Sequence, residues 1–311
     1  MFEKLEYVYA VYQERSFTKA AEKLFIAQPS LSAAIKGVEK EIGAPLFDRT
    51  RKVILTEIGK EYIAAAEKML RAEEEFVSRI HDIYGLETGK IVIGGTNYLS
   101  SHVLPPIIKR FSSRFPKIEV TLVEANSTVL GEMLGREEID LVVDSFDEQL
   151  QLYEGTPLTS ECIFLCVPAS FKINEKLKEY AVRGEMLRKG NKNKHFKSVP
   201  VSAFKDEPFV LLKSGNDMYN RAMRIFQKEK ISPKVAFSVD QLNISYALAQ
   251  SGMGSCFVTD TLVRYGNRSE NVVFYSVGEE SCNRTLYVAH KKNKYCSNAA
   301  KKFIEIAQQS F

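Results

Sequence analysis

The sequence predicts an α+β protein of several domains: a helical N-terminal region, one long helix, and two α/β lobes. Three observations support this prediction. Apolar residues recur at helical spacing through roughly the first 85 positions, strands and helices alternate from about residue 90, and the chain of 311 residues is too long for one ordinary hydrophobic core. The expected boundaries are 1–58 for the first domain, 59–88 for the long helix and 89–311 for the remainder, with lobe one at about 89–165 and 271–311 and lobe two at about 166–270.

The composition is that of a globular protein. The sequence is 45% apolar and 26% charged, and its net charge of +4 is too small to indicate a nucleic-acid partner by itself. No apolar run approaches the roughly 18–20 residues that span a bilayer, and the N-terminal residues lack the basic and apolar segments of a signal peptide. We therefore expect a cytoplasmic protein with no membrane partner, and any contact with DNA must come from local placement of its polar residues.

Residues 16–59 carry the most specific pattern in the chain, which is two short helices followed by a basic hairpin. Ser16 interrupts the first periodic segment, and Thr18 can cap a new helix. The next helix opens with Gln-Pro-Ser at 28–30, because proline is tolerated in a first helical turn, and Gly43 is a typical helix stop. The expected inward residues of this helix are Leu31, Ile35 and Val38, and the expected outward ones are Gln28, Ser30, Ser32, Lys36 and Lys40.

A long helix is expected from Leu55 onward. Apolar or small residues recur in it at alternating spacings of three and four, which is the seam of a coiled coil rather than the broader stripe of a helix packed on its own domain. We therefore expect this helix to pair with a second copy of itself, although packing on its own domain remains an alternative. The seam consists of Leu55, Ile58, Tyr62, Ala65, Met69, Ala72 and Phe76.

From residue 90 the pattern is that of an α/β fold. Continuous apolar strands that alternate with helices predict a parallel sheet covered on both faces, and the two successive sets predict two lobes with a cleft between them. The basic, Gly/Asn-rich segment 183–197 is expected to be a solvated loop. Strands are expected at 90–95, 118–125, 139–145, 208–212, 235–239, 254–259 and 284–290, and helices at about 103–115, 127–138, 216–228, 241–251 and the C-terminal end.

The block from Ser16 to Gly59 closely resembles the winged helix-turn-helix of the LysR-type transcriptional regulators. The matching residues are Ser16-Phe17, Ala20-Ala21, Leu24, Gln28-Pro29-Ser30-Leu31-Ser32, Ile35, Glu39, Gly43, Leu46-Phe47, Arg49, Leu55-Thr56 and Gly59. Weaker matches continue through both lobes, at Ile93-Gly94, Leu104-Pro105, Phe111, Phe115-Pro116, Asp140-Leu141 and Gly252-Met253-Gly254. The resemblance implies a transcriptional regulator with a two-lobed effector domain like a periplasmic binding protein. It also implies a homodimer formed through the linker helix, assembly of dimers into a tetramer, and RNA polymerase as a further partner.

Residues on the expected recognition helix have side chains suited to reading double-stranded DNA. Gln28 can form two hydrogen bonds to an adenine edge, Ser32 lies one turn on, and Pro29 can contact a thymine methyl group. The remaining candidates are expected to contact phosphates or the minor groove, and are Thr18, Ser30, Lys36, Arg49, Arg51 and Lys52.

The effector is expected beyond the carboxyl ends of the strands in lobe one. Hydroxyl groups there lie beside helix N-termini, which suits an anionic effector, although Ser127 and Thr128 alternatively only cap their helix. The candidate effector residues are Thr96, Tyr98 and Ser100 after the first strand, Ser127 and Thr128 after the second, and Gln241 on the facing lobe.

Two other functions remain open. A two-lobed α/β enzyme would have a similar architecture, but the sequence contains no nucleophile elbow, P-loop or paired-histidine motif. A thiol-based redox sensor would need a cysteine pair in lobe two, and residues 205–235 contain no cysteine. The five cysteines (Cys162, Cys166, Cys256, Cys282 and Cys296) are expected to be buried structural thiols, with no metal site and no cofactor.

Overall fold

The computed structural model describes residues 2–48, 53–85, 87–145, 152–189, 196–278 and 284–311. The chain forms two compact units, residues 1–80 and 81–311, and each is described by itself. Within the described residues, no helix is both long and apolar enough to cross a membrane.

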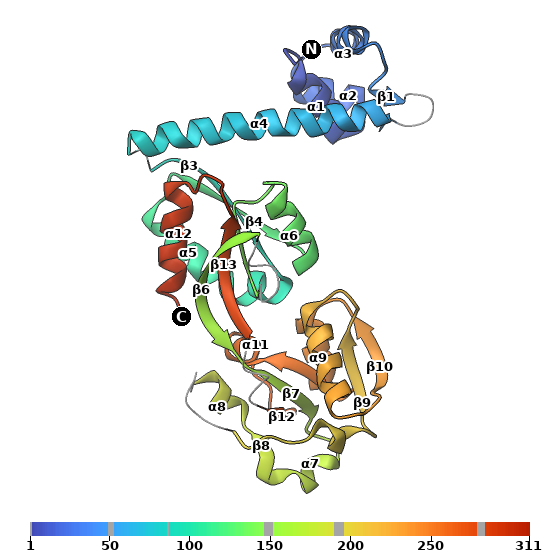
Figure 1. The fold of residues 1–311 in the computed structure, drawn as a ribbon, viewed down its shortest axis with the longest axis vertical. Helices are drawn as coiled ribbons and strands as arrows, with labels where there is room; N and C mark the ends of the chain where they lie inside the picture. The colour runs from blue at the N-terminus through green and yellow to red at the C-terminus, as the bar shows by residue number, and fades with distance from the viewer. Residues whose placement is uncertain (1, 49–52, 86, 146–151, 190–195, 279–283) are drawn as a thin grey trace. The chain divides into compact units, whose positions relative to one another are not determined.

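The first unit contains three short helices, a two-stranded hairpin and most of a long helix (Figure 1). Ser16 caps the second helix, since its Oγ accepts a hydrogen bond from the Lys19 amide at 3.3 Å, whereas Thr18 is already the second helical residue. The expected cap at Thr18 is therefore wrong by two positions. The elements are α1 (Leu5–Glu14), α2 (Phe17–Lys23), α3 (Gln28–Ile42), β1 (Phe47–Asp48), β2 (Ile54–Leu55) and α4 (Glu57–Ile83).

Helix α3 has the limits that its sequence predicts. Pro29 lies in its first turn, and Gly43 ends it at a φ of 84°, a left-handed conformation that glycine adopts without steric cost. Leu31, Ile35 and Val38 are buried against α1 and α2, as expected. The opposite face of α3 is consequently held outward.

Helix α4 begins at Glu57, two residues later than expected, because Leu55 pairs with Phe47 in the hairpin. Thr56 precedes the helix, and its hydroxyl accepts a hydrogen bond from the Gly59 amide at 2.9 Å. Tyr62 is buried and stacks on Phe2 with ring centroids 5.2 Å apart. Tyr62 of the expected seam therefore packs on its own domain, as the alternative interpretation proposed, whereas Ile58 of the seam is exposed.

Lobe one of the second unit is a five-stranded sheet in the order β4-β3-β5-β13-β6. β3, β4 and β5 are parallel, but β13 runs antiparallel to both β5 and β6, so the sheet is mixed rather than wholly parallel as expected. Helices α5 and α12 cover one face and α6 covers the other (Figure 1). The bounds are β3 (Gly89–Gly95), β4 (Ile118–Glu124), β5 (Leu141–Asp144), β6 (Tyr153–Glu161), β13 (Arg284–Lys291), a π-helical turn (Leu99–Val103), α5 (Leu104–Arg114), α6 (Ser127–Gly135) and α12 (Asn298–Gln308).

Lobe two is built on a second sheet, in which β11, β7, β12 and β8 are neighbours in that order and β10 pairs with β9. A bridge between Phe209 and Ser255 joins β9 to the residues that lead into β11. The bounds are β7 (Ile163–Pro168), β8 (Ala181–Val182), β9 (Pro208–Leu212), β10 (Lys234–Val239), β11 (Cys256–Thr259), β12 (Val272–Ser276), α7 (Ile173–Lys176), α8 (Gly184–Arg188), α9 (Asp217–Lys228), α10 (Leu242–Gln250), α11 (Asp260–Tyr265) and two 3-10 turns (Lys178–Tyr180 and Val201–Phe204).

The two crossings between the lobes lie at different positions from those expected. Strands β7 and β12 pair with each other in the lobe-two sheet, so the chain crosses at Cys162 and again between Ser276 and Arg284, rather than near 165 and 271. The basic segment 183–197 is not wholly a loop, because α8 occupies its beginning; residues 190–195 lie outside the described residues.

Candidate functional site

The outward face of α3 presents the polar residues that the sequence singles out. Gln28, Pro29, Ser30 and Lys36 are exposed, and Ser32 is half-buried beside them. Thr18 is exposed on α2. This arrangement leaves hydrogen-bonding groups free to meet the edges of bases, with the apolar face of the helix held in the core.

Glu39 has a role that its spacing alone did not reveal. Its carboxylate accepts hydrogen bonds from the amides of Leu46, at 2.9 Å, and Phe47, at 3.4 Å, so it ties the end of α3 to the start of the hairpin. The hairpin tip residues expected to contact DNA, Arg49, Arg51 and Lys52, lie outside the described residues.

In lobe one, three parallel strands end side by side, and polar residues follow each of them. Thr96 and Asn97 follow β3, Ser127 opens the helix after β4, and Asp144 ends β5 with Ser145 behind it. Gly95 lets the start of α5 pack closely against the end of β3, because a Cβ there would lie 2.6 Å from Leu104 Cδ1. The carboxyl edge of the lobe-one sheet thus brings together the residues expected to bind an effector, and it remains the candidate effector site.

Several of the predicted hydroxyl groups at this edge are already used within the protein. Ser100 donates to the Gly95 carbonyl at 3.0 Å, and Thr128 donates to the Gly215 carbonyl of lobe two at 3.5 Å. Neither Ser127 nor Thr128 is the helix cap, because the Asn126 Oδ1 accepts from the Val129 amide at 2.9 Å. The capping alternative is therefore wrong, and Thr128 instead contributes a contact between the lobes.

Gln241 also joins the lobes rather than facing an open cleft. Its Nε2 donates to Glu124 Oε1 at 3.4 Å, which links the start of α10 in lobe two to the end of β4 in lobe one.

A buried charged network, centred on Arg284, lies beside the strand ends and was not predicted as a whole. The Arg284 guanidinium donates to Glu161 and to the Tyr98 hydroxyl, the latter at 3.2 Å. It also lies 3.3 Å from Asp217 Oδ2 and 3.7 Å from Asp144 Oδ1. Of the five residues only Tyr98 was a candidate. A charged residue at the end of an apolar strand, such as Asp144 after Leu-Val-Val, is the signal that could have indicated the rest.

Burial and neighbouring charges shift the pKa values of three members of the network. Burial raises the pKa of Tyr98 well above its ordinary value, and Glu161 raises it further, so the phenol stays neutral. Burial alone would lower the pKa of Arg284, but Glu161 and the other partners raise it well above the ordinary value. Burial also raises the pKa of Asp144, although Arg284 opposes this effect.

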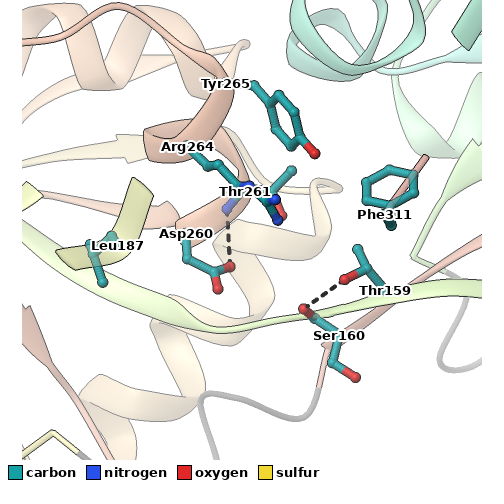
Figure 2. A pocket seen from close by; sticks show the side chains of 8 residues that line it. All are labelled: Thr159, Ser160, Leu187, Asp260, Thr261, Arg264, Tyr265 and Phe311. Atoms are coloured by element: carbon teal, nitrogen blue, oxygen red, sulfur yellow. Dashed lines mark hydrogen bonds between the residues drawn. The ribbon is translucent and has the colours of Figure 1, made fainter. Parts of the chain in front are cut away.

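A separate small cavity lies where the two lobes meet (Figure 2). Its volume of about 20 Å³ has room for about one water molecule, which is too little for an effector. Asp260 lines it, and its Oδ1 accepts hydrogen bonds from the amides of Thr261 and Cys162, both at 3.0 Å. Burial raises the pKa of Asp260 to about 6. The other lining residues are Thr159, Ser160, Leu187, Arg264, Tyr265 and Phe311.

The cysteines are not all thiols. Cys166 and Cys256 are free, buried and paired in register on neighbouring strands, and Cys296 is free and half-buried. Cys162, however, is disulfide-bonded, which corrects the expectation of a thiol there. Cys282 lies outside the described residues. Among the described residues no group of three or more His, Cys, Asp or Glu side chains could hold a metal ion.

The fold and the site define a class of protein in which a helix-turn-helix domain is joined by a long helix to a two-lobed ligand-binding domain. Comparison with known families agrees. The family described as bacterial regulatory helix-turn-helix protein, lysR family, matches residues 2–60, and the LysR substrate binding domain matches residues 85–311. The chain belongs to the LysR family of DNA-binding transcriptional regulators, which carry an effector-binding domain.

Individual relatives extend over nearly the whole chain. An uncharacterized HTH-type transcriptional regulator, YcgK of Bacillus subtilis (strain 168), is 31% identical over 310 residues, covering 98% of this chain and 93% of that protein. Full-length CbnR complexed with its target DNA is similar in structure with a TM-score of 0.70 at 18% identity, covering 100% of both chains. The effector binding domain of QuiR in complex with shikimate has a TM-score of 0.56 at 19% identity, covering 71% of this chain and 96% of that chain. These two structures support the fold.

Proposed function

We propose that the protein binds an operator through the exposed face of α3 and that a small molecule bound between its lobes controls this binding. The observation that carries the proposal is the set of polar side chains held outward on α3 by its buried face. CbnR, which has the same fold, was solved with its target DNA. The test is a mobility shift with genomic fragments, followed by footprinting of the bound fragment. A protein that retains no fragment above random DNA would contradict the proposal.

We propose further that α4 forms the dimer. Met69, Phe76 and Ile83 lie seven residues apart along it. Their exposed fractions are 47%, 63% and 79% respectively. Apolar residues at heptad spacing are stabilised by burial against a partner helix. In this proposal the first part of α4 packs on its own domain and the second part forms the dimer. Sedimentation of the full chain gives the stoichiometry directly.

Assembly of dimers into a tetramer is proposed to use the edges of the two sheets. Strands β4 and β10 lie at sheet edges, and Leu122, Val235 and Phe237 on them are exposed by 39%, 52% and 43%. An exposed apolar edge strand is a favoured surface for contact with another chain. A tetramer in sedimentation that becomes a dimer on Phe237→Lys would support this arrangement.

The effector is proposed to act by changing the contacts between the lobes. Arg284 to Asp217, Thr128 to Gly215 and Gln241 to Glu124 all cross from lobe one to lobe two. A ligand that binds one arrangement of the lobes more tightly shifts the population toward it, and the linker helices would transmit that shift to the DNA-binding domains. We propose that the region between the lobes binds a ligand and has no catalytic role. We also propose that the protein is cytoplasmic and that RNA polymerase is a further partner.

A second candidate function is redox sensing, which the disulfide of Cys162 favours. Cys162 lies at the crossing between the lobes, directly after Glu161 of the charged network. Reduction would release this constraint next to Arg284. Operator binding that changes between dithiothreitol and an oxidant in the parent and in Cys296→Ser, but not in Cys162→Ser, would support this function over ligand sensing.

A further inference from the structure

Four buried polar atoms at the carboxyl edge of the lobe-one sheet have no hydrogen-bond partner among the described residues. They are Thr96 Oγ1, Asn97 Oδ1, Asp144 Oδ2 and Ser145 Oγ. Gly95 pairs with Val143 in parallel register, so the residues that follow, Thr96 and Asp144, are neighbours on adjacent strands about 5 Å apart. Buried polar groups are nearly always hydrogen-bonded in native proteins, so four at one place indicate a partner other than the described residues.

The chemistry of these atoms selects the kind of partner. The Asn97 amide oxygen and the Asp144 carboxylate oxygen can only accept hydrogen bonds, and the hydroxyls of Thr96 and Ser145 can accept as well as donate. The site therefore requires hydrogen-bond donors. Asp144 is 1% exposed and ionisable, which favours a donor that also carries positive charge.

The charges around the site point in the same direction. Arg284 lies against Glu161 and Asp217, and Arg221 lies 2.9 Å from Asp217, so both guanidinium groups already have carboxylate partners. When Asp144 is ionised, three carboxylates face two guanidinium groups. An anionic effector, which the helix N-termini had suggested, would meet this excess of negative charge beside Ser127.

We propose that the effector carries a protonated primary amine, which donates N–H groups to Asp144 Oδ2 and Asn97 Oδ1. This inference rests on the proposed effector function and names the chemical class of the ligand. The ammonium group completes the hydrogen bonding of the strand ends and balances the third carboxylate, while Arg284 keeps its partners.

The experiment measures thermal unfolding of the full chain with small probes matched in shape and differing in charge. The three sets are n-butylammonium, butyrate and n-butanol; benzylammonium, benzoate and benzyl alcohol; and putrescine, succinate and 1,4-butanediol. We expect the melting temperature to rise with concentration for at least one amine and for none of its counterparts, because binding to the native state stabilises it by mass action. The dissociation constant follows from the concentration dependence.

Variants connect the shift to the site. Asp144→Asn keeps the shape but removes the charge, and is expected to weaken the amine at least about tenfold, since a charge-assisted hydrogen bond is replaced by a neutral one. Asn97→Asp adds a carboxylate and is expected to tighten it. Asp206→Asn, at a position in lobe two where the side chain is 78% exposed, is the matched control and should leave the affinity unchanged.

The outcomes separate the ligand class from the proposed function. Stabilisation by the carboxylates, tightened by Asp144→Asn, would overturn the amine while leaving effector control intact. An amine shift that persists in both Asp144→Asn and Asn97→Leu would show that the amine binds elsewhere, and would also overturn it. Specific operator binding without a shift by any amine overturns the ligand class alone, whereas absence of operator binding contradicts the proposed function itself.

Discussion

Arg284 Nε and Asp217 Oδ2 lie 3.3 Å apart, although 67 residues separate them in the sequence. Arg284 opens β13 in lobe one and Asp217 opens α9 in lobe two, so the pair spans the lobes. Asp217 also accepts a hydrogen bond from Arg221, which lies in the next turn of the same helix. A change in the spacing of the lobes must therefore change the distance between these two side chains, which makes the pair a reporter of the state of the effector domain.

Asp217→Asn is expected to loosen the two lobes. The substitution keeps the size of the side chain but removes the charge that faces Arg284 and Arg221, and hydrogen bonds to charged groups contribute about 1.5–3 kcal/mol. We expect the unfolding free energy to fall by about that amount in urea, and the radius of gyration in X-ray scattering to rise. Asp206→Asn provides the exposed control, and an Asp217→Asn protein that matches it in both measurements would contradict the role of the pair.

The sequence predicted the elements that local chemistry decides. Pro29 and Gly43 set the limits of α3, and the strands that were predicted in both lobes lie close to their expected positions, whereas β6, β7, β8 and β12 were not predicted. The sequence was less informative where two residues could serve equally. Ser16 and Thr18 can both cap α2, and only the backbone shows that Ser16 does.

Long-range contacts explain the rest of the difference. Tyr62 fits a coiled-coil seam by spacing, but Phe2 from the far end of the domain covers it. The network of Asp144, Glu161 and Arg284 joins three strands, and no local pattern reveals that their charges converge. The strand ends could thus be predicted as a candidate site from the sequence, whereas the charged network beside them could not.

Gln28→Ala is expected to cost about 1–3 kcal/mol of operator binding and to relax specificity at one base position, as for loss of a bidentate base contact. The measurement is a fluorescence titration of operator variants at one salt concentration. Gln227→Ala, at an exposed position on α9 in the effector domain, is the matched control. If Gln28→Ala discriminates among the operator variants as the parent does, α3 does not read bases through this residue.

Met69→Lys is expected to dissociate the dimer, because a charge placed in an apolar helix pair is desolvated without a partner. Sedimentation over a range of concentrations should show a dissociation constant raised at least about tenfold. Ala64→Lys introduces the same side chain at an exposed position of α4 away from the seam, and should leave the dimer intact. Equal behaviour of the two variants would assign the dimer to another surface.

Residues just before β3 are expected to matter for an isolated effector domain. Asp82 Oδ2 accepts hydrogen bonds from the Tyr295 hydroxyl at 2.5 Å and from the Asn298 amide, at the start of α12, at 2.9 Å. A fragment of residues 89–311 loses both, and we expect it to be about 1–3 kcal/mol less stable than a fragment of residues 81–311. Asp82→Ala in the longer fragment should reproduce the loss in urea unfolding, and Glu87→Ala should not. Equal stability of the two fragments would place the boundary at 89.

The stability of the protein is expected to depend on pH through Asp260. Burial raises its pKa in the folded protein to about 6, against an ordinary value of 3.8, so folding favours the protonated carboxyl. That stabilising contribution is complete below about 3.8 and is lost as the pH rises through about 6. Asn keeps an acceptor for the amides of Cys162 and Thr261 and cannot ionise.

Asp260→Asn is therefore expected to be more stable than the parent at pH 8, by about 1–3 kcal/mol for a shift of this size, with the difference closing as the pH falls toward 4. Urea unfolding of both proteins at pH 8, 6, 5 and 4 measures it. Asp206→Asn serves as the exposed control, in which the difference should stay small throughout. A gap between Asp260→Asn and the parent that is constant across this range would show that folding does not raise the pKa of Asp260, contrary to its burial beside the cavity.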